Sequence, residues 1–126
     1  MSSSYRDLRV WQQAMDLAMQ IYRLTEGFPK HELYGLTGQI RRAAISIPSN
    51  IAEGKGRRTD RDFSNFLFRA RGSLLELETQ ISLAQRLEYL KEADAASALK
   101  KTAAVGSSLT GLINSLRERE ETAVDA

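Results

Sequence analysis

The chain contains no cysteine and only one histidine among its 126 residues. Without cysteine it can form neither a disulfide framework nor a thiolate metal site, and one histidine leaves little material for a zinc site or for histidine-based catalysis. No apolar run approaches the roughly 20 residues that span a bilayer, and the first residues, MSSSYRDLRVW, lack the apolar core of a secretion signal. These absences predict a cytoplasmic protein with no membrane segment, no metal and no cofactor.

The charge of the chain is nearly balanced but unevenly distributed. The formal net charge is +2, yet residues 31–71 hold eight Arg or Lys against four Asp or Glu, and residues 72–126 hold six against nine. A basic middle and an acidic end suit an anionic partner, and they equally suit a head-to-tail assembly in which the two segments meet. A solvated surface of mixed charge is a third interpretation of the same pattern.

Four stretches of the sequence repeat apolar residues at the three- and four-residue steps of an α-helix. The third of them has the most regular pattern. A serine or threonine followed three residues later by an aspartate predicts capping boxes at Ser4/Asp7 and at Thr59/Asp62, where the first and third helices start. The four predicted helices cover residues 7–26, 31–53, 59–88 and 98–116.

The first helix has a wider apolar face than packing against one partner helix requires. Two adjacent stripes run along it, and only one is needed to form a core. The second stripe therefore indicates contact with a neighbouring chain. The stripes are Leu8, Trp11, Met15, Ala18 and Tyr22, and Val10, Ala14, Leu17, Ile21 and Leu24.

Short connections between the helices imply that consecutive helices are antiparallel neighbours. The sequence therefore predicts an all-α fold, an antiparallel up-down-up-down four-helix bundle, as a single domain over residues 1–126. We expect its core within about residues 5–116 and a frayed tail over residues 117–126, which have little apolar content. Pro48 lies inside the second helix and cannot donate to the carbonyl of Ala44, so a kink or a break is predicted near this proline.

The stretch AISIPSNIAEGKGRR, residues 44–58, ends the second helix with a lysine between two glycines and then two arginines. It is not a Walker loop, because the G-x-x-x-x-G-K-[ST] spacing and the preceding strand are both missing. Asp60 and Asp62 would also repel a phosphate from the start of the third helix. One interpretation is a loop whose basic side chains contact a nucleic-acid backbone, and the other is a loop that only interacts with solvent. The basic side chains are Lys55, Arg57, Arg58 and Arg61.

Arginines within the amphipathic helices must reach solvent, a carboxylate or a neighbouring subunit. For these residues, ion pairing within the bundle or across an interface is favoured over contact with nucleic acid. The aromatic residues, including Phe63 and Phe66, fall mostly on apolar faces and are assigned to the core or to an interface. The helical arginines are Arg41, Arg42, Arg69 and Arg71.

No catalytic arrangement is evident in the sequence. Glu76 and Glu78 are two positions apart and point to different sides of a helix, so they are poor partners for acid–base catalysis. His31 stands alone at a helix boundary, without the Glu-x-x-His motifs of a diiron bundle, and no G-x-S-x-G motif occurs. The sequence predicts a protein that is not an enzyme.

Three segments, DLRVWQQAMDLA, FPKHELYGLTGQIRRAAISIPSNIAEGKGRR and FLFRARGSLLELETQISLAQRLEYL, together resemble the four-helix-bundle family named for proteins encoded in 23S ribosomal RNA intervening sequences. The pair IPSNIAEG and RGSLLELETQ carries the resemblance most specifically. The family is similar to the accessory variability determinant of diversity-generating retroelements, a basic bundle protein that associates with a reverse transcriptase and nucleic acid. The resemblance implies a homo-oligomer, a pentameric ring or barrel, without established catalysis.

The resemblance also implies where nucleic acid would bind. The near-neutral charge departs from a strongly basic accessory protein, and each neutralised phosphate is a major source of affinity. We expect a non-enzymatic, homo-oligomeric bundle that binds RNA, DNA or a nucleic-acid-processing partner such as a reverse transcriptase. The alternative is a structural or protein-interaction scaffold whose arginines form ion pairs at subunit interfaces. The expected binding residues are Arg41, Arg42, Lys55, Arg57, Arg58 and Arg61.

Overall fold

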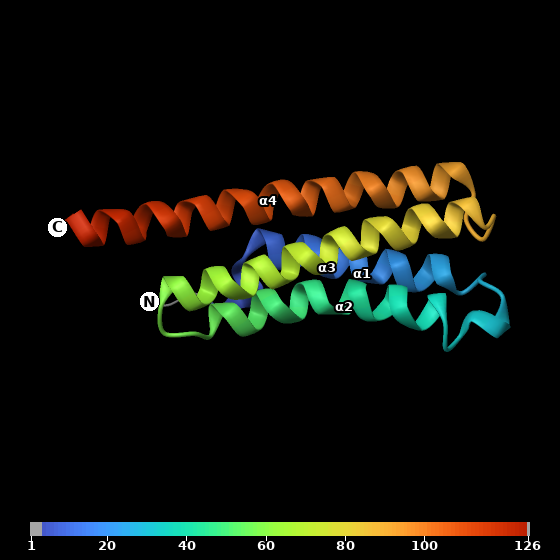
Figure 1. Cartoon of the computed structure of the whole chain (residues 1–126), viewed down its shortest axis with the longest axis horizontal. Coiled ribbons are helices and arrows are strands. Elements are labelled where there is room, and N and C mark those ends of the chain that lie inside the picture. Colours follow the sequence, from blue (N-terminus) through green and yellow to red (C-terminus); the bar gives the residue numbers. More distant parts are fainter. Residues whose placement is uncertain (1–3, 126) are drawn as a thin grey trace.

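Four α-helices make up most of the computed structural model, which describes residues 4–125 and the side chains of residues 4–122. No strand occurs within residues 4–125. Figure 1 shows the helices side by side along one long axis, with successive helices running in opposite directions. The all-α, four-helix prediction is confirmed. The helices are α1 (Arg9–Thr25), α2 (Leu36–Lys55), α3 (Asp60–Arg86) and α4 (Glu92–Asp125), with two short 3-10 helices, η1 (Tyr5–Asp7) and η2 (Lys30–Glu32).

The core lies where the apolar stripes of the four helices meet. Each helix packs against two others, in the cyclic order α1, α2, α3, α4. Burial of each large aliphatic side chain stabilises the fold by about 1.5–3 kcal/mol. On α1 the stripe that enters the core is the one that begins at Val10, whereas Met15 and Tyr22 of the other stripe stay exposed. Among the fully buried side chains are Leu17, Ile21, Ile40, Ile47, Ile51, Leu67, Leu77, Ile81, Val105 and Leu109.

The two predicted capping boxes have different outcomes. The Ser4 backbone N–H donates to Asp7 Oδ2 at 3.2 Å, and Ser4 Oγ accepts from the Arg6 N–H at 3.1 Å, but this box starts η1. Helix α1 begins only at Arg9, without a side-chain cap. Thr59 Oγ1 accepts the Asp62 N–H at 3.1 Å and caps α3, which starts at Asp60, close to the predicted start; the return bond from the Thr59 N–H to the Asp62 side chain, which would complete this box, is absent.

The start of α2 differs from the prediction, which placed a helix from residue 31. Residues 30–32 form η2, and α2 begins at Leu36. Glu32 Oε1 accepts the Leu36 N–H at 3.2 Å, while the Tyr89 hydroxyl donates to Glu32 Oε2 at 2.9 Å. A Cβ on Gly35 would lie 2.6 Å from Glu32 Oε1. The carboxylate therefore caps α2 across a position that only glycine fills without displacing it.

Helix α2 continues through Pro48 without interruption. A break at the proline is therefore excluded, and the kink stays a prediction. The side chain of Asn50 donates to the Ser46 carbonyl at 2.8 Å and to Ser46 Oγ at 3.0 Å. Ser46 Oγ also lies 2.8 Å from Ser73 Oγ of α3. Polar contacts thus link the turn around Pro48 to the neighbouring helix.

Helix α4 is longer at both ends than the sequence pattern predicted. It begins at Glu92 rather than near residue 98, and residues 117–125 continue the helix where a frayed tail was expected. The apolar pattern stops near Leu116, but Arg and Glu have high helix propensity and extend the helix without burial. Arg119 Nη2 lies 3.1 Å from Asp60 Oδ2, which ties this end of α4 to the start of α3.

A left-handed residue ends α3. Glu88 has a φ of 64°, a conformation that costs an L-residue with a side chain about 1–2 kcal/mol. The Glu88 N–H donates to the Gln85 carbonyl and the Tyr89 N–H to the Ala84 carbonyl, both at 2.9 Å. This pattern is the Schellman motif, in which glycine is usually found at this position.

We expect Glu88→Gly to stabilise the protein by about 1 kcal/mol, because glycine adopts the left-handed conformation without the clash of a Cβ. Urea unfolding followed by circular dichroism measures the change. Glu76→Gly, at an exposed position inside α3, is the matched control and should destabilise by about 1 kcal/mol. An equal loss of stability in both variants would contradict the assignment of strain to residue 88.

The Glu32 cap predicts an acid-sensitive contribution to stability. The Leu36 amide and the Tyr89 hydroxyl, which donate to the carboxylate, lower the pKa of Glu32 from its ordinary value of 4.5. A lowered pKa in the folded state contributes stability that is present above the ordinary value and lost as pH falls through the folded value. Glu32→Gln should therefore be less stable than wild type at neutral pH, and this difference in stability, the gap, should close below pH 4.5.

Thermal unfolding over a pH series measures that gap. Glu26→Gln, at an exposed position in the same connection, is the control and should unfold close to wild type at neutral pH. A gap for Glu32→Gln that is constant from neutral to acidic pH would show that the carboxylate's charge does not support the cap.

Candidate nucleic-acid interface

The turn between α2 and α3 is shaped by a close approach of the two helices at Gly54. A Cβ at this position would lie 2.7 Å from Phe66 Cβ and 3.0 Å from Phe63 Cδ1. Side-chain atoms do not approach a real Cβ so closely, so a larger residue would push the helices apart. The glycine thus lets two aromatic rings of α3 pack against the last turn of α2.

Basic residues after Gly54 lie over these two rings. Lys55 Nζ is 5.9 Å from the centre of the Phe63 ring, and the guanidinium carbon of Arg57 is 4.6 Å from the centre of the Phe66 ring. Such cation–π contacts hold a cation in place while its N–H groups stay available to other partners. Arg57 Nη2 also lies 3.7 Å from Glu53 Oε1, in an exposed pair.

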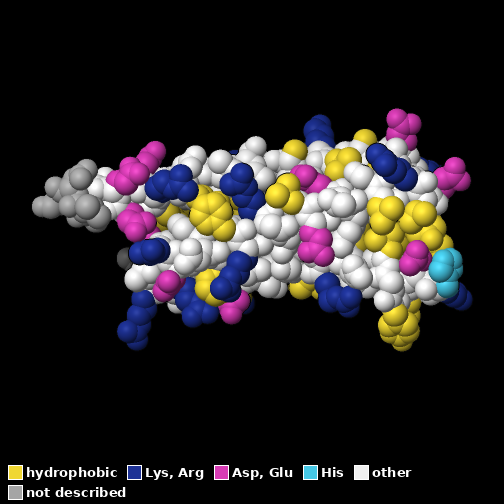
Figure 2. All heavy atoms as spheres, in the orientation of Figure 1, with side chains coloured by type: hydrophobic (Ala, Val, Ile, Leu, Met, Phe, Trp, Pro, Cys, Tyr) yellow, Lys and Arg dark blue, Asp and Glu magenta, His cyan; other side chains and the backbone are white. Residues whose placement is uncertain are grey.

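Four of the six predicted binding residues therefore gather at one end of the bundle, where α2 turns into α3. Figure 2 shows dark blue Lys and Arg side chains, with magenta carboxylates among them, concentrated toward the left end, where that turn lies in Figure 1. Asp60, the first residue of α3, is paired with Arg119. The four residues are Lys55, Arg57, Arg58 and Arg61, and the last three are exposed.

Arg41 is not part of this group. Its Nε donates to Thr25 Oγ1 at 2.8 Å, its Nη2 donates to the Tyr22 carbonyl at 3.4 Å, and its guanidinium carbon lies 4.7 Å from the centre of the Tyr22 ring. It also lies fourteen residues before Lys55 on α2, a rise of about 21 Å. Arg41 therefore connects α2 to α1 through uncharged partners, not through the ion pair that was expected for the helical arginines.

Arg42 is also separate from the turn. It lines a polar hollow of about 300 Å³ between α2 and α3, together with Ser46, Ser73 and Glu76. Within residues 4–122 it forms no ion pair. The structure thus divides the predicted site into a cluster at the turn and two arginines nearer the other end of α2.

Two further residues at the turn were not predicted as binding residues. Arg69, which follows Phe66 by three positions on α3, places its guanidinium carbon 4.6 Å from the centre of the same ring. The sequence predicts Phe66 in the core or at an interface and Arg69 in an ion pair. The sequence signal that could have revealed this contact is the i, i+3 spacing of an aromatic residue and an arginine, which makes them neighbours on a helix.

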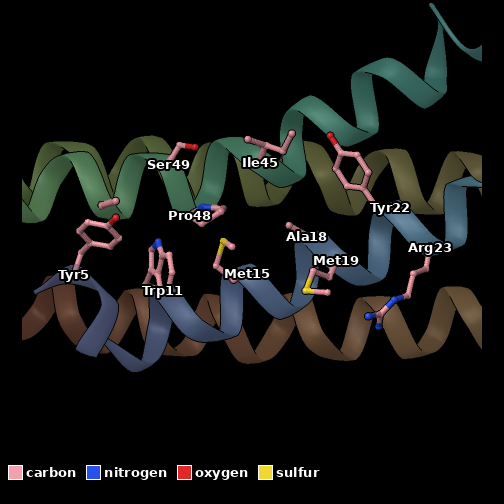
Figure 3. A pocket seen from close by; sticks show the side chains of 11 residues that line it. Tyr5, Trp11, Met15, Ala18, Met19, Tyr22, Arg23, Ile45, Pro48 and Ser49 are labelled. Carbon is pink, nitrogen blue, oxygen red and sulfur yellow. The ribbon is translucent and has the colours of Figure 1, made fainter.

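A second feature is an apolar groove between α1 and α2. It has a volume of about 510 Å³, and Figure 3 shows Trp11 and Met15 of α1 pointing toward Pro48 of α2. One wall is formed by four residues of the α1 stripe that begins at Leu8, namely Trp11, Met15, Ala18 and Tyr22, of which Ala18 also belongs to the core. The exposed lining residues Met15, Met19, Tyr22 and Ile45 are 37% to 50% exposed.

Neither a cluster of metal ligands nor a membrane-spanning helix occurs among the described residues. Across residues 4–122, no three histidine, aspartate or glutamate side chains come together as metal ligands would. None of the helices within residues 4–125 has the length and apolar character to cross a bilayer.

Comparison with known proteins gives a family. The family model described as 23S rRNA-intervening sequence protein matches residues 6–111. A crystal structure of a protein with unknown function from the S23 ribosomal protein family of Bacteroides thetaiotaomicron is similar in fold, with a TM-score of 0.77 and 24% identity over 83% of this chain and 95% of that chain. No curated protein matches the sequence. Because the family model covers most of the chain, this protein belongs to the 23S rRNA-intervening sequence protein family.

Proposed function

We propose that this protein is a non-enzymatic, homo-oligomeric bundle that binds the backbone of RNA or DNA, alone or together with a nucleic-acid-processing partner, through the turn between α2 and α3. The observation that supports the proposal is the grouping of Lys55, Arg57, Arg58 and Arg61 where α2 ends and α3 begins, at one end of the bundle. Neutralising phosphates with such side chains releases counterions, which supplies most of non-specific affinity. A cytoplasmic setting belongs to the same proposal, as does a partner of the reverse-transcriptase type.

The non-catalytic part of the proposal rests on the use of the ionisable groups. The pair with displaced pKa values, Glu32 and Tyr89, joins the start of α2 to the segment after α3, where both groups have a structural role. Glu76 accepts from the Gln80 side chain at 3.3 Å, and Glu78 lies on the rim of a different hollow, between α3 and α4. Neither arrangement pairs an acid with a base across a substrate-sized gap.

The oligomeric part of the proposal rests on the groove between α1 and α2. A soluble monomer rarely leaves such a contiguous apolar surface uncovered, and a groove rich in Met, Trp and Tyr is typical of an interface core. We propose that a second copy of the chain covers it. A pentameric ring is the assembly that the resemblance to the accessory variability determinant implies.

A scaffold without nucleic-acid contact is the second candidate, and the existing pairs favour it. Arg57 lies near Glu53, Arg119 pairs with Asp60, and Arg41 is engaged by α1. If subunit interfaces engage the remaining arginines in the same way, the turn contributes to assembly only. The two candidate functions differ in whether reversing the charge of the turn weakens binding to nucleic acid.

Reversing two charges of the turn should abolish most of the binding to nucleic acid. We expect Arg57→Glu/Arg58→Glu to weaken binding to a labelled single-stranded RNA by at least about tenfold at low salt, and to reduce the slope of log K against log salt concentration by about 1.4, since each lost phosphate contact removes about 0.7. Fluorescence anisotropy over a salt series measures both quantities.

Lys100→Glu/Lys101→Glu is the matched control, because it makes the same charge change at two adjacent exposed positions on α4. This variant should bind within about twofold of wild type, since only long-range, screened electrostatics changes. Absence of binding by wild type at low salt would exclude direct nucleic-acid contact and favour the scaffold.

Charge placed in the apolar groove should dissociate the assembly. We expect Met15→Glu/Ile45→Glu to reduce the mass measured by light scattering to that of one chain, because two carboxylates would be buried without partners at the interface. The circular dichroism spectrum should stay helical, since both positions are exposed in the single chain. Leu83→Glu, at an exposed leucine of α3, is the control; an unchanged mass for the double variant would contradict the assigned interface.

A further inference from the structure

The Phe66 ring lies at the base of the basic cluster. Only 8% of the residue is exposed, because its Cβ packs against the last turn of α2 where Gly54 has no side chain. Its position is therefore fixed by the backbones of two helices. A side chain that contacts this ring is held at a defined place on the surface.

Two cations from different elements share this one ring. Arg57 comes from the connection before α3 and Arg69 from the third turn of α3, and each guanidinium carbon is 4.6 Å from the ring centre. The two carbons are therefore at most 9.2 Å apart. Like charges this close repel each other, and the electron-rich faces of one aromatic ring offset only part of that repulsion.

Carboxylates offset little of the remaining charge. Arg57 has Glu53 at 3.7 Å in a pair whose two side chains are 46% and 58% exposed. Arg69 forms no ion pair within residues 4–122. Both guanidinium groups lie over the ring, and apart from the Glu53 contact of Arg57 neither has an ion-pair partner within residues 4–122, so N–H groups of both remain available for an acceptor in solvent. An anion between or beside these edges would satisfy both cations at once.

We infer that Arg57 and Arg69, held in place by Phe66, form a two-pronged site for neighbouring phosphates of one nucleic-acid strand. This inference rests on the proposed function and adds Arg69 as a contact residue and Phe66 as a positioning residue. Phosphates follow one another by about 3.4 Å of rise along a strand. Two guanidinium groups within 9.2 Å can therefore bind phosphates of adjacent or nearly adjacent nucleotides.

The same geometry indicates what the site does not recognise. A base stacks on an exposed aromatic face, but the Phe66 ring is almost fully buried and carries two cations. No face is left for a nucleobase. The site therefore binds the backbone and should not distinguish base sequences.

The experiment compares Phe66→Leu with Phe66→Tyr in anisotropy titrations with a labelled single-stranded RNA at low salt. Leucine keeps the apolar burial but removes the ring, whereas tyrosine keeps the ring. We expect Phe66→Leu to weaken binding about fivefold, corresponding to the loss of cation–π contacts, and Phe66→Tyr to stay within twofold of wild type. Phe28→Leu makes the same change at a similarly buried ring that packs against Tyr89 and should not affect binding.

A second comparison tests the contact residue. Arg69→Ala should weaken binding about tenfold and reduce the salt slope by about 0.7, as one lost phosphate contact does. Arg86→Ala, an exposed arginine at the other end of α3, should change neither. A titration with inorganic pyrophosphate as competitor separates a strand site from a site for free phosphate, because only the latter is blocked at equal phosphate concentration.

The outcomes separate this inference from the proposed function. The proposed function stands if wild type binds RNA and Arg57→Glu/Arg58→Glu loses most of that binding. The two-pronged site is nevertheless wrong if Phe66→Leu binds RNA as tightly as Phe66→Tyr, or if Arg69→Ala binds it as tightly as Arg86→Ala. If pyrophosphate blocks the site, its ligand is a small phosphate. If wild type binds no RNA at low salt, both are wrong.

Discussion

The close approach of α2 and α3 at Gly54 is the constraint on which the functional end of the molecule depends. A Cβ at Gly54 would lie 2.7 Å from Phe66 Cβ. Because glycine has none, the two helices approach closely and are connected by a turn of four residues, 56–59, which lies over two aromatic rings. The rings then offer their faces to the basic side chains that follow. Backbone packing and surface charge are thus linked through one residue without a side chain.

The two apolar stripes of α1 separate stability from assembly. The stripe that starts at Val10 enters the core and stabilises the single chain, whereas the stripe with Met15 and Tyr22 lines a groove that the single chain does not fill. Methionine suits such a surface because its flexible side chain adapts to a partner. One helix can therefore hold its own bundle together and still offer a surface to another chain.

Much of the fold could be predicted because apolar periodicity reports which faces of the helices are buried. The late start of α2 could not be predicted in this way. The Glu32 carboxylate that caps α2 also accepts from the hydroxyl of Tyr89, a residue 57 positions away in the sequence. The length of α4 was missed because the apolar pattern ends before the helix does. Of the candidate site, the turn residues could be predicted from their shared loop, whereas the contact of Arg41 with Thr25 and the shared ring of Arg57 and Arg69 arise only from tertiary packing.

The ion pair between Arg119 and Asp60 joins positions 59 residues apart. It means that the electrostatic character of the α2–α3 turn is set partly from outside the turn. Arg119 balances the charge of Asp60, so that this carboxylate offsets less of the positive charge of the neighbouring arginines. The end of the last helix therefore contributes one positive charge beside a turn that lies in the middle of the sequence.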